Sequence, residues 1–558
     1  MKLHLPTKAR RYRRLTALGI ALGAYVTVVA VTLREPQVTP LDKPAAVEIR
    51  DGWLYRHNEK LLLKAVGWDP ARPGELPWER RRSRGLVRQD LHAIRSAGFN
   101  AIRTWELLAP EELAAAEAEG LMVLQGIWLD PAGRFASSEF RHEAAEKVRW
   151  AVRATRDSGA VVLYLIMNEP APAAVLREGV GAAQSLFREL RTIAYAEGAR
   201  APVTFANWPG AEFVDDSSLD VVAANLYPFR PRTLLNMIGY AGMVKLWKQE
   251  QAGGRPLIVS EFGISVSPNG DPRSQEAPGG LSEEEQAGML PQLADAIFRT
   301  GAAGAALFMW NDGWWKNAED AGDELTHDSG DGEEWFGLHA FSDVGADFGR
   351  PRPALAAMRR WNRAVLTQPT DGVAATRELA VEMHSDEPGI SVQVSIDGQN
   401  RSTIPLQIEG RWLRGRLLLP GDSEGIHRLR FTIAGSDGPI GTAERYVVTP
   451  GHGLYLRMTS HGEGMHRTLL IEASTDRGVP AVGISVRLAI VDGSHRDDRQ
   501  MVLRTDARGQ ARTTVQVPRD EKIVLMAVAA VPGPEGAPPL ALARGFLYSD
   551  ALRQSSVR

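Results

Sequence analysis

Over residues 46–366 the sequence alternates apolar, β-rich runs with amphipathic stretches, and no other feature constrains the fold as strongly. In the amphipathic stretches, such as residues 86–97, apolar side chains recur three and four positions apart, which predicts helices. Eight apolar runs, most of them followed by such a stretch, predict an α/β fold, a closed (β/α)8 or TIM barrel. The predicted strands are residues 61–66, 101–104, 121–127, 161–167, 203–206, 221–225, 257–260 and 305–310.

A doubly wound open sheet is the alternative for this alternation. Such a sheet usually carries a glycine-rich phosphate loop after its first strand. Here the first strand is followed by Gly67-Trp68-Asp69-Pro70, which lacks the glycine spacing of that loop. The barrel is therefore the favoured interpretation.

The helical periodicity stops after Asn362, and the remaining chain has short alternating runs such as residues 390–396 and 427–433. This pattern predicts two β-sandwich modules, at residues 370–450 and 451–550. In the second, residues 478–483 and 505–509 together resemble the turns of bacterial immunoglobulin-like or macroglobulin-like modules.

The first fourteen residues carry six lysines and arginines and no acid, and residues 15–33 carry no charge. As a helix, these 19 residues span about 29 Å, close to the thickness of a bilayer core. We therefore predict a cytoplasmic basic segment (1–14), a transmembrane signal-anchor (15–33) and a proline-containing linker (34–45), with the rest of the chain outside the cytoplasm. A cleaved signal peptide, which would make the protein secreted, is the alternative.

Composition excludes several function classes. Cysteine is absent, which excludes disulfides, thiolate zinc sites, Fe–S clusters and cysteine nucleophiles. With 65 basic and 68 acidic residues there is no overall basic field, so nucleic acid is not an expected partner. The histidines form no HExxH or paired motif, and we predict neither a catalytic metal nor a cofactor. The acid-rich residues 319–334 are interpreted as a solvated loop.

Two glutamates stand at the ends of predicted strands. Glu169 follows the fourth strand in Asn168-Glu169-Pro170, and Glu261 follows the seventh in Ser260-Glu261-Phe262-Gly263. In a barrel, both would open onto the carboxyl-end face, where chemistry takes place. Two carboxylates that face each other across a sugar are what glycoside cleavage requires.

These two motifs resemble the acid/base and nucleophile motifs of glycoside hydrolase clan A, whose members are retaining (β/α)8 enzymes. The resemblance is closest to families 5 and 2 and covers residues 46–366. Further matching segments occur in the family's order: residues 51–55, 63–68, 98–105, 225–228 and 352–355.

The resemblance implies a role for each motif residue. Glu169 would be the acid/base and Glu261 the nucleophile. Arg103 would support the nucleophile and keep it ionised, Tyr227 would touch it, and Trp310 would form an aromatic platform under the sugar. Asn168 would hydrogen-bond a sugar 2-hydroxyl.

Trp128 and Trp315 are further candidates for sugar stacking, because both follow predicted strands. Trp105, Trp208 and Trp314 share this position, but packing in the core or at the rim is as good an interpretation for each.

Three functions follow from this pattern. The first is a retaining glycoside hydrolase acting on a β-linked polysaccharide or oligosaccharide, with a glucan or mannan implied by the resemblance. The second is a transglycosylase on the same scaffold, in which a sugar hydroxyl replaces water. The third is a non-catalytic glycan-binding protein of a polysaccharide export or assembly system.

Overall fold

A computed structural model describes residues 47–78, 84–274, 277–316, 323–374, 377–420, 424–492 and 499–555. The predicted basic segment, signal-anchor and linker lie outside these residues, so all three stay predictions. Within the described part of the chain, no helix combines the length and apolar composition that a membrane span requires.

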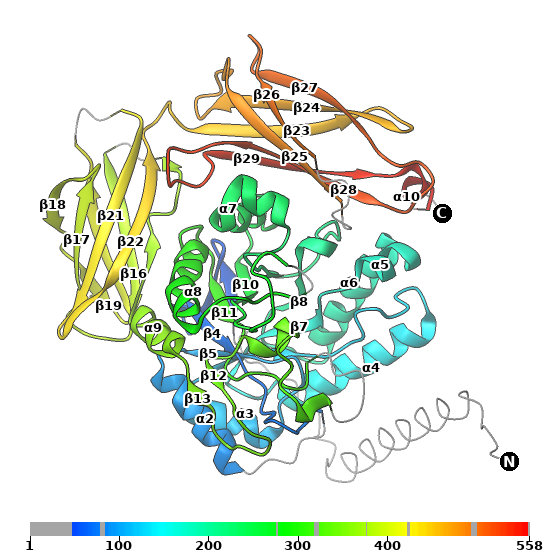
Figure 1. Cartoon of the computed structure of the whole chain (residues 1–558), viewed down its shortest axis with the longest axis vertical. Helices are drawn as coiled ribbons and strands as arrows, with labels where there is room; N and C mark the ends of the chain where they lie inside the picture. The colour runs from blue at the N-terminus through cyan, green and yellow to red at the C-terminus, as the bar shows by residue number, and fades with distance from the viewer. Residues whose placement is uncertain are drawn as a thin grey trace. The chain divides into compact units, whose positions relative to one another are not determined.

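Eight parallel strands close into a barrel, as the sequence predicts (Figure 1). The order around the barrel is β10-β11-β4-β5-β6-β7-β8-β9, so neighbours along the chain are neighbours in space. The strands are β4 (Leu63–Gly67), β5 (Ala101–Arg103), β6 (Met122–Gly126), β7 (Val161–Asn168), β8 (Val203–Asn207), β9 (Val222–Asn225), β10 (Leu257–Phe262) and β11 (Gly304–Leu307).

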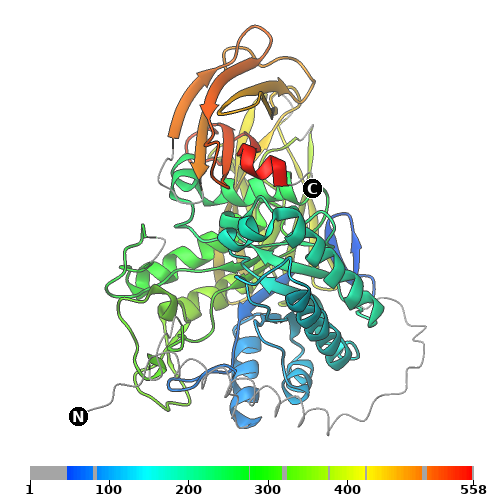
Figure 2. The same cartoon turned by 90° about the vertical axis from the view of Figure 1, so that its right-hand side faces the viewer.

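Helices surround the strands (Figure 2). Local signals start several of them: α4 has a Ser137 cap, α8 has a capping box between Ser282 and Glu285, and α3, α5 and α9 begin with proline. The helices are α2 (Arg84–Ser96), α3 (Pro110–Ala118), α4 (Ser138–Thr155), α5 (Pro172–Glu178), α6 (Val180–Ala196), α7 (Arg232–Leu246), α8 (Glu283–Phe298) and α9 (Pro353–Asn362).

Short elements complete this part of the chain. A three-stranded sheet precedes the barrel, and a two-stranded sheet follows β11. These elements are β1 (Glu48–Arg50), β2 (Trp53–Arg56), β3 (Glu59–Lys60), β12 (His339–Ala340) and β13 (Arg350–Pro351), with helical turns η1 (Pro209–Ala211), η2 (Trp247–Gln251), η3 (Asp323–Leu325) and η4 (Gly332–Trp335).

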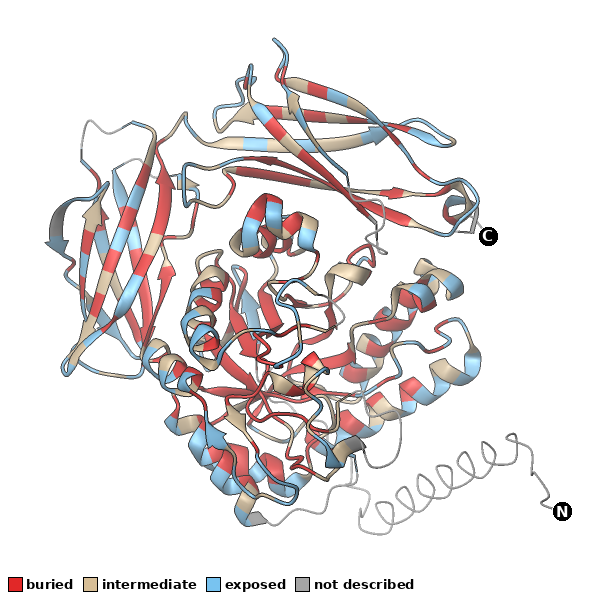
Figure 3. Ribbon diagram, in the orientation of Figure 1, coloured by how far each residue is buried: buried red, intermediate tan, exposed pale blue. Residues whose placement is uncertain are grey.

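Burial explains why the barrel strands show no alternation in sequence (Figure 3). Seven of the eight residues of β7 are buried, because its two faces contact the barrel interior and the surrounding helices. By contrast, β21 (Ile426–Gly435) alternates between buried and less buried positions, because one of its faces is open.

The chain after α9 forms two β-sandwiches, each with one apolar core between two sheets. The first joins β14 (Ala364–Gln368), β16 (Glu378–Ser385), β20 (Trp412–Leu418) and β19 (Gln407–Glu409) to a sheet of β15 (Val373–Ala374), β22 (Gly438–Val448), β21, β17 (Ser391–Ile396) and β18 (Gln399–Thr403). The second joins β23 (Leu454–His461), β24 (His466–Thr475) and β27 (Gln510–Gln516) to a sheet of β26 (Arg499–Arg504), β25 (Ser485–Asp492), β28 (Val524–Val531) and β29 (Ala541–Tyr548). A last helix, α10, spans Asp550–Ser555.

A buried ion pair joins the second sandwich to the barrel. The Arg544 guanidinium on β29 donates to the Glu212 carboxylate, which follows η1, and the two side chains are 6% and 3% exposed. We expect Arg544→Met to lower the free energy of unfolding by about 3–5 kcal/mol, because it leaves the Glu212 charge buried without its partner. Urea denaturation measures this effect. The control is Arg544→Met/Glu212→Leu, which should recover most of the loss; an equal loss in both variants would contradict the reason given.

Candidate active site

Glu261 is the next-to-last residue of strand β10, on the carboxyl-end face of the barrel. The pairing of β10 with β9 and with β11 shifts register just after Val259, and such irregularities re-aim side chains near active sites. The Glu261 side chain is 7% exposed. A group this buried needs partners for its charge.

Three donors hold the Glu261 carboxylate. Arg103, at the end of β5, donates to Oε1 and supplies the opposite charge. Trp105 Nε1 donates to the same oxygen at 3.1 Å, and the Tyr227 hydroxyl donates to Oε2 at 2.7 Å. Both oxygens are therefore fixed, in a site where Arg103 compensates the negative charge.

Glu169 follows directly on β7, beside a register shift between β7 and β8. Its φ is +45°, a left-handed conformation that costs a non-glycine residue about 1–3 kcal/mol. Its amide donates to Ala206 O at 2.9 Å, and Asn225 Nδ2 donates to its Oε1 at 2.9 Å. The surrounding strands thus hold the side chain in one orientation.

Burial, and then the nearby charge of Glu261, raise the pKa of Glu169 to about 7, against the opposing hydrogen bond from Asn225. Glu169 is therefore able to hold a proton near neutral pH and to give it away. The two carboxylates differ in their direct partners: Glu261 accepts a hydrogen bond from the Arg103 guanidinium, whereas Glu169 accepts one from the neutral Asn225 amide. Such a difference separates an acid from a nucleophile.

A hydrogen-bond network links the two glutamates. Arg103 Nη2 donates to Asn168 Oδ1 at 2.6 Å, and Asn225 Nδ2 donates to the same oxygen at 3.1 Å. The Ser260 hydroxyl donates to Asn225 Oδ1 at 2.7 Å. This network orients the amide of Asn168, whose side chain lines the cavity described next. Asn225 was part of a matching segment, but the sequence alone assigned it no role.

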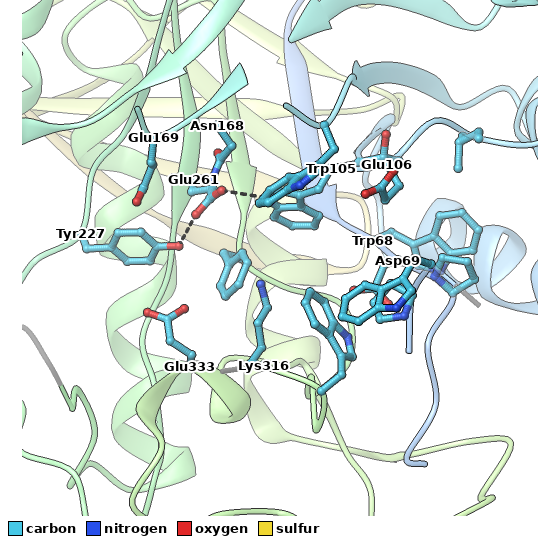
Figure 4. A pocket seen from close by; sticks show the side chains of 18 of the residues that line it. Trp68, Asp69, Trp105, Glu106, Asn168, Glu169, Tyr227, Glu261, Lys316 and Glu333 are labelled. Carbon is cyan, nitrogen blue, oxygen red and sulfur yellow. Dashed lines mark hydrogen bonds between the residues drawn. The ribbon is translucent and has the colours of Figure 1, made fainter. Parts of the chain in front are cut away.

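Both glutamates line one cavity of about 260 Å³ at the carboxyl-end face (Figure 4). Eight of its lining residues are aromatic, five are acidic and two are basic. The lining residues are Trp68, Asp69, Pro70, Pro77, Trp78, Thr104, Trp105, Glu106, Leu108, Trp128, Asn168, Glu169, Tyr227, Phe229, Arg230, Glu261, Phe308, Trp315, Lys316 and Glu333. The structure thus brings Glu169, Glu261, Asn168, Tyr227, Trp128 and Trp315 together here, with Arg103 directly behind Glu261.

Trp310 does not line this cavity. Its side chain is 2% exposed and packs against His339, with ring centroids 4.5 Å apart. The predicted eighth strand continued to residue 310, but β11 ends at Leu307, so Phe308 is the first residue beyond it. The aromatic ring in the cavity is therefore that of Phe308, which contacts Trp105 at a centroid distance of 5.4 Å. The prediction of Trp310 as the platform is corrected accordingly.

Three tryptophans had sugar stacking and packing as equally good interpretations. Of these, Trp105 lines the cavity, whereas Trp208 and Trp314 do not. The Trp208 indole donates to Pro170 O at 3.2 Å, and Trp314 stacks on His327. Both therefore support the loops around the cavity.

Two charged residues of the long loop after β11 were missed as site residues. Lys316 Nζ lies over the rings of Trp315, Phe308 and Trp105, at 4.4, 4.7 and 5.2 Å from their centroids. Glu333 lines the same cavity, and burial raises its pKa against the charges of Lys316 and Arg230. The interpretation of this acid-rich stretch as a solvated loop is therefore wrong for Glu333.

The shifted pKa of Glu169 predicts a pH dependence of stability. Between its ordinary pKa of 4.5 and about 7, the folded chain keeps a proton that the unfolded chain has lost. This contribution to the free energy of unfolding is therefore complete below pH 4.5 and lost as pH rises through 7. We expect Glu169→Gln to gain stability over the wild type as pH rises through this window.

Urea denaturation at several pH values measures this gain. The exposed Glu463 provides the matched control for the substitution, as Glu463→Gln. A constant difference for Glu169→Gln would contradict the shift.

Among the described residues, no group of three or more His, Asp or Glu side chains is arranged to hold a metal ion.

No protein-family model matches the chain, and no curated protein matches its sequence. Among solved structures, it is similar to β-glucuronidase from Parabacteroides merdae, with 14% identity over 90% of this chain and 64% of that one, and a TM-score of 0.43. A putative β-galactosidase from Bacteroides fragilis has 15% identity over 73% of this chain and 57% of that one, with a TM-score of 0.44. The β-glucuronidase from Ruminococcus gnavus, in complex with D-glucuronic acid, has 16% identity over 56% of this chain and 51% of that one, with a TM-score of 0.45. The chain thus spans less than two thirds of the length of these proteins.

Proposed function

We propose that this protein is a retaining glycoside hydrolase that acts on a β-linked polysaccharide or oligosaccharide. One observation carries the proposal: Glu169 and Glu261 line the same cavity with different partners. Glu261 is held by a cation and two further donors, whereas Glu169 has a pKa raised to about 7. This contrast supports a nucleophile and a general acid, the two groups that the reaction needs.

In the first step, a carboxylate oxygen of Glu261 attacks the anomeric carbon while the bond to the leaving oxygen breaks. The proton of Glu169 moves to that oxygen, so the leaving group departs as an alcohol. The sugar is then esterified to Glu261, and Glu169 is a carboxylate. Asn168, oriented by Arg103 and Asn225, is placed to bind a hydroxyl of this sugar.

In the second step, the Glu169 carboxylate takes a proton from water, and the oxygen of that water attacks the anomeric carbon. The bond to Glu261 breaks, which restores both carboxyl groups to their starting states. Because each step inverts the anomeric carbon, the product keeps the β configuration.

The stereochemistry of the first product tests this proposal. The full chain is assayed on a panel of β- and α-linked glycans, and proton NMR follows the anomer released before mutarotation. We expect turnover of a β-linked glycan with the β anomer appearing first. Release of the α anomer first, or no turnover across the panel, would contradict the proposal; Glu169→Gln/Glu261→Gln controls for contaminating activity.

We further propose that residues 15–33 anchor the protein in the cytoplasmic membrane, with the barrel outside the cytoplasm. The basic residues before this segment support that orientation. Extraction of the full chain from membranes by detergent, but not by high salt or alkali, tests the anchor. Recovery of a shortened chain from the medium would support a cleaved signal peptide instead.

A further inference from the structure

The aromatic wall of the cavity lies mostly on one side of the catalytic pair. In Figure 4, Glu261 lies between Glu169 and Trp105, with Trp68 and Asp69 beyond Trp105. These aromatic residues follow strands β4 and β5, whereas Glu169 follows β7, farther around the barrel. The cavity therefore extends past Glu261 in the direction away from Glu169.

A continuous series of contacts runs along this extension. Trp105 donates to Glu261, and the Lys316 ammonium lies over both Trp105 and Trp315. Trp315 meets Trp78 edge to face, with ring centroids 6.2 Å apart. Trp105, Trp315 and Trp78 thus form a row of side chains from the nucleophile Glu261 to the exposed edge of the cavity.

Two features of this wall fit a bound ligand. Trp78 is 61% exposed, a large apolar face that lines the cavity mouth. The Lys316 ammonium lies 4.4 Å from the Trp315 ring centroid and lines the same cavity. An ammonium donates hydrogen bonds to sugar hydroxyls, so this part of the wall combines aromatic faces with a donor.

The reaction fixes which part of a glycan occupies this side. Glu169 protonates the leaving oxygen, so the bond from the anomeric carbon to the leaving group points toward Glu169. The opposite edge of the same sugar ring, which carries the link to the next sugar at the non-reducing end, then points away from Glu169. That direction is the one in which the tryptophan wall extends.

We propose that Trp105, Trp315 and Trp78 form a subsite for a second sugar on the non-reducing side of the cleaved bond. This inference rests on the proposed function and sharpens it: the substrate carries at least two sugars on that side. Glu261 is then esterified by an oligosaccharide, and the enzyme cleaves within a glycan chain instead of removing single terminal sugars.

Chain-length dependence tests the subsite. The full chain is assayed on 4-nitrophenyl β-glycosides with one, two and three sugars, in the glucose and mannose series with β-1,3 and β-1,4 links. We expect kcat/KM to rise by about tenfold or more from one sugar to two, because remote binding energy is used at the reacting centre. On a hexasaccharide labelled at its reducing end, we expect no release of monosaccharide from the other end.

Variants assign the effect to the wall. Trp78→Ala and Trp315→Ala should each lower the ratio of kcat/KM for two sugars over one sugar toward unity. Trp150→Ala, on the outer surface of α4, should leave that ratio at its wild-type value. Because Trp78 is exposed, its variant keeps the test valid even where Trp315→Ala fails to fold, which thermal unfolding would reveal.

Two kinds of negative result are distinguishable. Turnover that is independent of chain length, an unchanged ratio in the folded tryptophan variants, or monosaccharide as the main product would overturn the subsite alone. Absence of turnover on every glycoside would overturn the proposed function and the subsite with it.

Discussion

Glu261→Gln is expected to lower the turnover of every substrate by about 10,000-fold or more, since removal of a nucleophile from a unit of this kind costs up to about a millionfold. The amide retains the shape of the carboxylate but cannot attack the anomeric carbon. The Arg103 guanidinium also loses the charge that it compensates. The measurement is kcat/KM on the best substrate of the panel, with thermal unfolding to show that the variant is folded.

Trapping of the covalent intermediate tests independently whether Glu261 is the residue that attacks the anomeric carbon. A 2-deoxy-2-fluoro β-glycoside with a dinitrophenyl leaving group reacts with the nucleophile but turns over slowly, because fluorine destabilises the charged transition state. We expect mass spectrometry to find the label on Glu261. The matched control is Glu333→Gln, another carboxylate of the same cavity, which should still be labelled at Glu261. A label elsewhere, or full activity in Glu261→Gln, would contradict the assignment.

The positions of the site residues on the barrel strands were predictable because local signals coincide there. Glu169, Arg103 and Glu261 each stand at the end of an apolar run bounded by turn residues. In a closed parallel barrel such ends meet at one face, whatever their separation along the chain. Knowledge of the strands therefore brings these side chains near one another without any knowledge of the loops.

The loop residues of the site were not predictable in the same way. Lys316 and Glu333 reach the cavity through the path of the long loop after β11, which is set by tertiary packing. At Gly332, for example, a Cβ atom would lie 2.2 Å from Pro278 O, so the loop is pressed against another segment. Acidic composition alone is equally typical of a solvated loop, and the sequence offered no other signal.

The sequence predicted Trp310 instead of Phe308 as the aromatic residue of the cavity, and this error has a different cause. Residues 304–310 are apolar without alternation, so the pattern does not show where the strand ends. The backbone of Trp310 instead pairs with Gly67 O and His339 N, outside the strand β11. An error of three residues at a strand end is thus enough to exchange one aromatic ring for another at the site.

The second large effect concerns Glu169. Glu169→Ala is expected to lower kcat/KM by about 100- to 10,000-fold on glycosides with a poor leaving group, because the general acid is lost. On a 2,4-dinitrophenyl glycoside, which needs no proton, formation of the intermediate should persist. Its hydrolysis should become slow, which pre-steady-state measurements record as a burst of dinitrophenol.

Azide distinguishes a catalytic Glu169 from one that only supports the structure. A small anion placed where the side chain was removed attacks the intermediate without a base, so Glu169→Ala should be accelerated by azide and should yield a β-glycosyl azide. Glu169→Gln, which fills that space, is the matched control and should respond less. Equal losses on all leaving groups, with no azide product, would mean that the residue serves mainly to hold its strained backbone turn.

In the proposed reaction the pKa of Glu169 also has to change between the two steps, and the contacts of Glu169 supply a cause. Part of the rise to about 7 comes from the negative charge of Glu261, which disappears when Glu261 becomes an ester. The pKa of Glu169 should then fall, which favours the carboxylate that the second step needs as its base. Glu261→Gln mimics that loss of charge, so carbon NMR titration of Glu169 should give a lower pKa in this variant than in the wild type. An unchanged or higher pKa in this variant would show that the charge of Glu261 does not contribute to the raised pKa of Glu169. The change of Glu169 from an acid to a base would then need another cause.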